Sequence, residues 1–165
     1  MTPILRHATL KDVKKIHKLI NSFAAKGQMI GRPLSQLYDH LRDFWVFEDH
    51  DTKEIIGCCA LQFCWESLAE IRSLAVNSDY HKKGIGRALV SKVMEEANQY
   101  GMTHVFTLTY QPGFFKKFDF KIIDKSELPL KIWADCIHCV KFPDCDETAM
   151  MNTIPVDTDP RYKFC

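Results

Sequence analysis

The stretch VNSDYHKKGIGRALVSKVMEEA, from Val76 to Ala97, decides how this sequence is read. It begins with turn residues and a cluster of positive charge, and two glycines then lead directly into a long amphipathic helix. The first turn of a helix has N–H groups without an intrahelical partner, and the helix dipole adds partial positive charge there. Glycines also let a ligand approach the backbone closely. The combination predicts a phosphate-binding loop, with an ordinary surface loop as the alternative.

The composition predicts one folded domain. The chain has 165 residues, of which 46% are hydrophobic, and a formal net charge of +1. This size and apolar content are typical of a single globular domain, which we expect over residues 1–154, with a mobile tail at residues 155–165. The near-neutral charge argues against a strongly basic nucleic-acid binder, and no apolar run is long enough to span a membrane.

The cysteines and the N-terminus bear on the compartment. MTPILRHATLKD lacks the apolar segment of a signal peptide. Seven cysteines are an odd number, and three of them (Cys58, Cys59 and Cys64) lie in one apolar, strand-like run. This pattern fits reduced thiols better than a disulfide framework, so we expect a cytoplasmic protein.

Hydrophobic periodicity predicts a mixed α/β (α+β) sheet flanked by helices. We expect Thr9 to cap the first helix, together with Asp12, and Ser35 to cap the second. The predicted strands are Ile4–His7, 44–48, 54–65, 68–76, His104–Thr109, Phe120–Ile123 and Glu147–Ile154, and the longest predicted helices are 13–23 and Ile85–Tyr100.

With these elements in place, the chain resembles the GNAT superfamily of acyl-CoA N-acetyltransferases. The family pattern is a strand, then (Q/R)-x-x-G-x-(G/A), then a helix, and here Gly84 and Gly86 match the small positions while His81 replaces Gln or Arg. Three further stretches, GRPLSQLYDHLRDFWV, AEIRSLAV and LPLKIWADCIHCVKFPDCDETAM, resemble the short stand-alone N-acetylglutamate synthases. The resemblance implies a GNAT fold and acetyl-CoA as co-substrate.

Cofactor-binding residues follow from this match. The pantetheine arm would lie along the strand backbone like a short added strand, against Leu74, Ala75 and Val76. The pyrophosphate would be held by the N–H groups of the loop and by its basic side chains. The residues concerned are His81, Lys82, Lys83, Gly84, Ile85, Gly86 and Arg87.

Amine attack on a thioester requires a proton acceptor and benefits from a proton donor to the leaving sulfur. Many relatives have a glutamate at the position of Glu70, which therefore is the expected base; an ion pair with Arg72 is its alternative. Relatives often place a tyrosine in a pattern like FY-x-x-x-GF, but this chain has FFKKFDF, with Phe115 at that position. Tyr110, at the end of the preceding strand, becomes the candidate acid.

An amino-acid acceptor with two carboxylates needs cationic partners, and arginine binds carboxylates with two parallel hydrogen bonds. Arg72 shares a strand face with Glu70, and Arg32 lies in the Gly/Pro loop that covers the acceptor in relatives. Both are predicted substrate-binding residues, with a plain surface charge as the alternative for Arg32.

The segment DCIHCVKFPDCDE contains Cys136, His138, Cys139 and Cys145. Such residues can bind zinc, but a second C-x-x-C half is missing. We therefore expect structural thiols and no metal.

The sequence thus predicts acetyl transfer from acetyl-CoA to an amino-acid α-amine, that of L-glutamate in arginine biosynthesis according to the resemblance. Acetylation of another amine, such as a protein lysine or a polyamine, and a non-catalytic acetyl-CoA-binding regulator are the alternatives. We expect no nucleic-acid or membrane partner, and a homodimer is left open.

Overall fold

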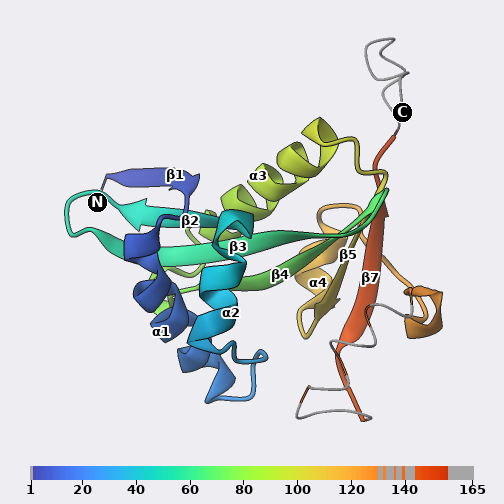
Figure 1. Ribbon diagram of the computed structural model, residues 1–165, viewed down its shortest axis with the longest axis horizontal. Coiled ribbons are helices and arrows are strands. Elements are labelled where there is room, and N and C mark those ends of the chain that lie inside the picture. The colour runs from blue at the N-terminus through green and yellow to red at the C-terminus, as the bar shows by residue number, and fades with distance from the viewer. Residues whose placement is uncertain (1, 130–131, 133–135, 137–138, 140–143, 156–165) are drawn as a thin grey trace. The chain divides into compact units, whose positions relative to one another are not determined.

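A computed structural model describes residues 2–129, 132, 136, 139 and 144–155 (Figure 1). The chain divides into two compact units, which are treated separately below. Unit 1 comprises Met1–Gln62 and Ile71–Val93, and unit 2 comprises Phe63–Glu70 and Met94–Cys165. The expected domain boundary at residue 154 stays a prediction.

Unit 1 contains an antiparallel strand series. Strand β1 (Pro3–His7) pairs with β2 (Phe44–Asp49), which in turn pairs with β3 (Glu54–Trp65). The register of β2 and β3 shifts between Phe47 and Glu48. Strand β4 (Leu68–Val76) follows β3 after a short turn, and both strands continue from one unit into the other.

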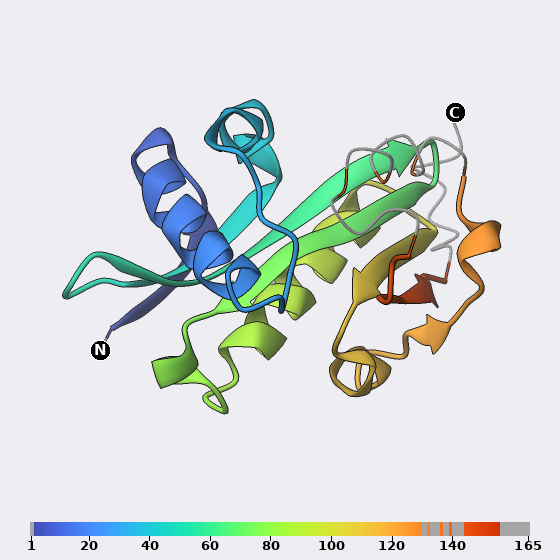
Figure 2. The same ribbon diagram turned by 90° about the horizontal axis from the view of Figure 1, so that it is seen from below.

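Helices cover the two faces of β3 in unit 1 (Figure 2). Helix α1 (Val13–Ala24) buries Val13, Ile16 and Ile20 in one core cluster with Cys58. A Cβ added to the preceding Gly57 would meet Ile85 and Leu89, which belong to helix α3 (Ile85–Gln99). Because neighbouring strand residues point to opposite faces, α1 and α3 lie on opposite sides of β3.

The start of α1 is fixed by polar contacts. The Asp12 carboxylate accepts hydrogen bonds from the backbone N–H and the hydroxyl of Thr9, at 2.7 and 3.0 Å, as the capping motif predicted. Arg6 bridges this carboxylate to Glu48 of β2. Burial acts to raise the pKa of Asp12, but the hydrogen bonds from Arg6 and Thr9 outweigh it and hold that pKa below its usual value.

The start of the second helix differs from the sequence prediction. Helix α2 (Leu34–Asp39) begins one residue before Ser35, and Pro33 occupies its N-cap, so the expected serine cap is wrong. A proline there favours helix entry through its fixed φ. On β2, Trp45 stacks on His7 with 3.8 Å between ring centroids, and the Lys92 ammonium lies 5.0 Å from the Trp45 ring.

Unit 2 is built around strand β5 (His104–Thr109), which pairs antiparallel with β7 (Thr148–Thr153). Strand β6 (Lys121–Ile122) adds to β7, and helix α4 (Pro112–Lys116) follows β5. The Ser67 carbonyl accepts hydrogen bonds from the N–H groups of Thr103 and His104, so β4 and β5 begin side by side. Leu68, Phe106, Leu128, Ile132 and Ala149 form the core of this unit.

The strands form one mixed seven-stranded sheet in the order β1-β2-β3-β4-β5-β7-β6. This confirms the predicted fold class. Within the described ranges, no helix combines the length and apolar character needed to cross a membrane.

Candidate active site

The glycine loop in unit 1 leads from the end of β4 into helix α3. After β4 ends at Val76, a single 3-10 turn (Ser78–Tyr80) leads to Lys82 and Gly84, which have φ of 63° and 79°. The first helical hydrogen bond of α3 runs from Ala88 N to Gly84 O, at 2.9 Å. The N–H groups before Ala88 therefore lie in the open first turn, where an anion can bind.

The basic side chains of this loop are exposed to solvent. They are His81, Lys82, Lys83 and Arg87. The Lys83 ammonium lies 4.9 Å from the centroid of the Tyr80 ring. The His81 ring is turned back toward β4, with Nε2 at 2.7 Å from the Val76 carbonyl oxygen, and it stacks on Phe23 at 6.3 Å. In this conformation His81 closes the loop onto the end of the strand.

The strand that leads into the loop is irregular at Ser73, which has a φ of 54°. A left-handed residue inside a strand interrupts regular pairing, as in a β-bulge. We call this the Ser73 kink. The predicted pantetheine-binding residues Leu74, Ala75 and Val76 follow it directly, and Asn77 N then donates to Ile56 O at 2.9 Å.

Both predicted substrate arginines lie in unit 1 near this kink: Arg72 precedes Ser73 on β4, and Arg32 contacts the Ser73 side chain. Arg32 is buried, with 6% of its surface exposed, and its Nη1 donates to Ser73 Oγ at 3.4 Å. The surface-charge alternative for Arg32 is therefore wrong. Arg72 is half-buried, and its Nη1 donates to Gln62 Oε1 at 2.7 Å.

The predicted proton-transfer residues lie in unit 2. Glu70 is buried on β4, with 8% exposed. Tyr110 follows β5, and its hydroxyl donates to Asp146 Oδ1 at 2.7 Å. Asp146, like the buried Glu147 beside it, was not among the predicted site residues. Both precede β7, and only the pairing of β7 with β5 brings them to Tyr110.

Phe115 occupies the position where relatives of the predicted family have tyrosine. Its ring is buried in α4 and lies 5.2 Å from Phe114 and 5.3 Å from Phe120, centroid to centroid. A phenylalanine offers no proton, so this position contributes packing only.

Cys58 and Cys59 are buried thiols. Burial raises the pKa of Cys58 to about 12 and that of Cys59 well above its usual value, so neither is a ready nucleophile. Cys139 N donates to Cys136 O at 2.9 Å, while His138 of the predicted cluster lies outside the described residues. In the part of the chain that the structure describes, no three His, Cys, Asp or Glu residues are arranged to hold a metal ion.

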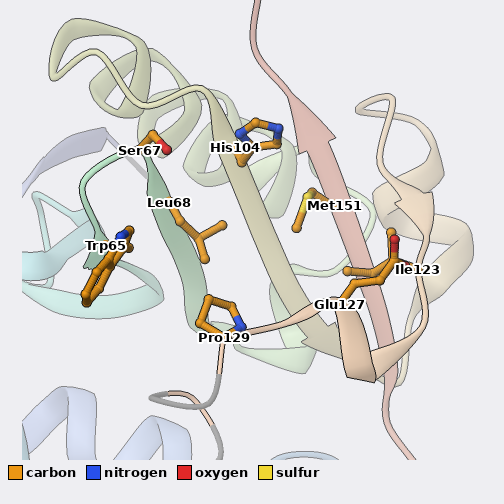
Figure 3. Close-up of a pocket in the computed structure, with 8 residues that line it drawn as sticks. All are labelled: Trp65, Ser67, Leu68, His104, Ile123, Glu127, Pro129 and Met151. Atoms are coloured by element: carbon orange, nitrogen blue, oxygen red, sulfur yellow. The ribbon is translucent and has the colours of Figure 1, made fainter.

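Unit 2 also contains a shallow apolar pocket of about 350 Å³ (Figure 3). Its walls come from the ends of β3 and β7, the starts of β4 and β5, and the segment after β6. The residues that line it are Trp65, Ser67, Leu68, His104, Ile123, Glu127, Pro129 and Met151. Neither Glu70 nor Tyr110 is among them, so this pocket is not the predicted site of acetyl transfer.

Comparison with known proteins shows the family. The model described as acetyltransferase (GNAT) domain matches residues 40–122, half of the chain. The chain belongs to the GNAT acetyltransferase family. The matched range runs from the start of β2 through the glycine loop, Glu70 and Tyr110 to β6, so the predicted site of this acetyltransferase falls largely inside it.

Sequence similarity to other proteins covers most of the chain. The acetyltransferase is 42% identical to an uncharacterized N-acetyltransferase of Chlorobaculum tepidum, over 91% of this chain and 96% of that protein. It is 32% identical to the amino-acid acetyltransferase of Mycobacterium tuberculosis, over 81% of this chain and 76% of that protein.

Solved structures agree in fold. Rv2747 from Mycobacterium tuberculosis, in complex with CoA and NLQ, superposes with a TM-score of 0.78 at 27% identity, over 92% of this chain and 99% of that one. N-acetylglutamate synthase from Neisseria gonorrhoeae, with coenzyme A and N-acetyl-glutamate, gives 0.80 at 22% identity, over 93% of this chain but 35% of that one. Acetyl-CoA is the co-substrate that fits this family.

Proposed function

We propose that this acetyltransferase moves the acetyl group of acetyl-CoA to the α-amine of L-glutamate, as a step of arginine biosynthesis. The observation that carries the amino-acid class is the 32% identity to a protein named amino-acid acetyltransferase. The narrower choice of glutamate is supported by Arg32, which contacts Ser73, and by Arg72, which precedes Ser73 on β4. Their two guanidinium groups could bind two carboxylates.

The loop before α3 would bind the pyrophosphate. The open N–H groups from Lys82 to Arg87 would face the phosphate oxygens, and Lys82, Lys83 and Arg87 would add positive charge. Leu74, Ala75 and Val76 would pair with the amides of the pantetheine arm along the strand backbone.

The reaction proposed is direct transfer. Glu70 would accept the proton that the ammonium of the acceptor must lose, through water if needed, and the free amine would attack the thioester carbonyl. When the carbon–sulfur bond breaks, the Tyr110 hydroxyl would donate its proton to the sulfur and would turn away from Asp146 to do so. The attacking nitrogen would lose its second proton as the amide forms, and this proton would restore the phenol. An acyl-cysteine route is disfavoured for Cys58 and Cys59, because burial keeps both thiols protonated.

The experiment is an acceptor panel in which release of the free CoA thiol is followed at fixed acetyl-CoA. L-glutamate should be turned over, and L-glutamine, which has the same shape without the side-chain charge, should be the matched weak acceptor. A lysine peptide and a polyamine represent the other amines. Faster turnover of either of these, or of glutamine, would replace glutamate in the proposal. Acetyl-CoA binding without turnover of any amine would identify a regulator.

A cytoplasmic location belongs to the same proposal. The buried thiols of Cys58 and Cys59 fit a reducing compartment. Fractionation of cells that express the chain, with markers for each compartment, tests it.

A further inference from the structure

Ser73 is held from two sides by buried side chains of unit 1. Arg32 Nη1 donates to its hydroxyl oxygen at 3.4 Å, and the Cys58 thiol donates to its carbonyl oxygen at 3.4 Å. Arg32 is 6% exposed and Cys58 is completely buried. Ser73 itself is half-buried, so both contacts are partly shielded from water, which makes them electrostatically stronger than the same contacts on the surface.

The conformation of Ser73 needs such support. A residue other than glycine in the left-handed region is strained and persists only where its surroundings fix it. Cys58 is suited to a lasting contact, because burial raises the pKa of its thiol to about 12, and the thiol keeps its proton. The opposing effects of the Ala75 backbone and the Arg32 charge are smaller.

The loop that carries Arg32 is itself seated on α1. Asn21 Nδ2 lies 3.5 Å from the Arg32 carbonyl oxygen and 2.8 Å from the His17 carbonyl oxygen. At the preceding Gly31, an added Cβ would come within 2.6 Å of Asn21 Oδ1. The absence of a side chain at Gly31 thus allows the loop to approach α1, and the Arg32 side chain reaches from there to β4.

We infer that Arg32 is a positioning residue for the cofactor: it holds the Ser73 kink and thereby sets the direction of the Leu74–Val76 backbone groups that would bind the pantetheine arm. The inference rests on the proposed binding of acetyl-CoA to this strand. It gives Arg32 a role separate from contact with an acceptor carboxylate. If Arg32 positions the strand, its substitution weakens binding of acetyl-CoA; if it contacts a carboxylate, its substitution weakens binding of the acceptor.

The first test is equilibrium binding of acetyl-CoA by calorimetry, without acceptor. Ser73→Ala removes the hydroxyl, and Arg32→Lys removes the planar guanidinium that reaches it. Each should raise the Kd of acetyl-CoA by about tenfold. The Kd of the double variant should be no higher than that of the weaker-binding single variant, because both substitutions remove the same hydrogen bond. Arg42→Lys, at an exposed arginine of the same unit, is the matched control and should leave the Kd unchanged.

A rescue experiment separates positioning from charge. Glycine adopts a left-handed φ without the penalty of a Cβ, so Ser73→Gly should keep the kink without help from Arg32. Adding Ser73→Gly to Arg32→Lys should therefore return the Kd of acetyl-CoA to within about threefold of the wild-type value. If Arg32→Lys instead leaves the Kd unchanged, or the glycine gives no rescue, Arg32 does not position the strand.

A second readout needs no cofactor. Hydrogen exchange of the amides of residues 73–76 should accelerate in Arg32→Lys and slow again in the variant that also carries Ser73→Gly. If the wild-type protein does not bind acetyl-CoA, the proposed function fails, and exchange alone then decides whether Arg32 holds the kink. Unchanged exchange in Arg32→Lys would contradict the inference whether or not acetyl-CoA binds.

Discussion

Units 1 and 2 place different demands on the side chains of the predicted site. In unit 1 the glycine loop presents backbone N–H groups at the start of α3, and its basic side chains are exposed. In unit 2 the predicted chemistry depends on two individual groups, the buried carboxylate of Glu70 and the hydroxyl of Tyr110, which is hydrogen-bonded to Asp146. A backbone cradle needs only the correct fold, whereas proton transfer needs particular atoms.

Each unit departs from the family pattern at one position, and the two departures differ in their consequence for the proposed site. Unit 1 has His81 where the family pattern has Gln or Arg, and the loop still forms with left-handed Lys82 and Gly84. Unit 2 has Phe115 where relatives have tyrosine, and this change removes a proton donor altogether. In the proposed mechanism Tyr110 supplies this proton from a different element. We therefore expect a backbone site to tolerate a change of side chain that a proton-transfer site has to compensate.

The largest effect is expected in unit 2. Glu70→Gln keeps the shape of the side chain but removes the proton acceptor, so kcat should fall by about 10²-fold at neutral pH, the low end for general base catalysis. The loss should shrink at high pH, where the acceptor amine is already deprotonated. A kcat–pH profile of both proteins checks this. Wild-type kcat at neutral pH would leave Glu70 a structural role only.

In unit 1 the corresponding change is Gly86→Val in the first turn of α3. A branched side chain there would crowd the phosphate-binding N–H groups, so the Kd of acetyl-CoA should rise at least tenfold, or about 1.4 kcal/mol. Calorimetry measures the affinity, and circular dichroism confirms that the variant is folded. Unchanged affinity in a folded variant would exclude this loop as the cofactor site.

Arg72→Lys tests the acceptor side of unit 1. Lysine keeps the charge but cannot bind a carboxylate with two parallel hydrogen bonds, and losing a charged hydrogen-bond partner costs about 1.5–3 kcal/mol. The KM for glutamate should rise tenfold or more, while that for acetyl-CoA stays within about threefold. Steady-state kinetics with each substrate varied in turn separates the two. A change confined to acetyl-CoA would move Arg72 to the cofactor site.

Tyr110→Phe should have a smaller effect than Glu70→Gln, about fivefold to tenfold in kcat. A thiol with a pKa near 8.5 leaves readily as thiolate, so a proton donor helps it less than a base helps the ammonium. Asp146→Ala is the companion variant, because it removes the hydrogen-bond partner and keeps the phenol. If Tyr110→Phe has wild-type kcat across the pH range, the proton donor is another group.

The smallest effect concerns the Cys58 thiol beneath the kink in unit 1. In the folded chain its pKa is raised to about 12, whereas an exposed thiol ionises near pH 8.5. As the pH rises above that value, the unfolded chain loses the proton first, so the folded state becomes less stable by about 0.7 kcal/mol between pH 8 and pH 9. Urea unfolding under reductant gives the free energy of unfolding of the wild type and of Cys58→Ser at each pH. Between pH 8 and pH 9 the wild-type value should fall by this amount more than that of the variant. Equal slopes would contradict a buried, protonated thiol.

Local signals in the sequence predicted most of the elements. The predicted helix Ile85–Tyr100 is observed at Ile85–Gln99, because the glycines before it and the apolar spacing within it are both local features. The predicted strand Glu147–Ile154 is observed at Thr148–Thr153. The N-cap of α2 was misplaced by two residues, since Pro33 and Ser35 are both acceptable near a helix N-terminus and only the structure decides between them.

The site was less accessible to sequence reasoning. Ser73 is left-handed although serine has no preference for that region, so its φ follows from Arg32 and Cys58, 41 and 15 residues away. The contact between Tyr110 and Asp146 spans 36 residues and arises from strand pairing. Hydrophobic periodicity reports on residues that are close in the sequence, so it predicts neither of these two long-range contacts. Whether the predicted residues act as assigned stays a prediction for each of them.

The contacts of Trp45 with the tilted His7 ring and with the Lys92 ammonium have a practical consequence for spectroscopy. Unit 1 holds this partly covered indole, whereas Trp65 of unit 2 is 65% exposed to water. A covered indole fluoresces at a shorter wavelength than a hydrated one, so Trp45 and Trp65 should differ in the wavelength of maximum emission. A Trp133→Phe variant removes the third tryptophan of the chain, so that only Trp45 and Trp65 emit. In this variant, separation of β1 from β2 would appear as a red shift of the Trp45 emission band. Unfolding of the two units could then be followed in one sample without a label.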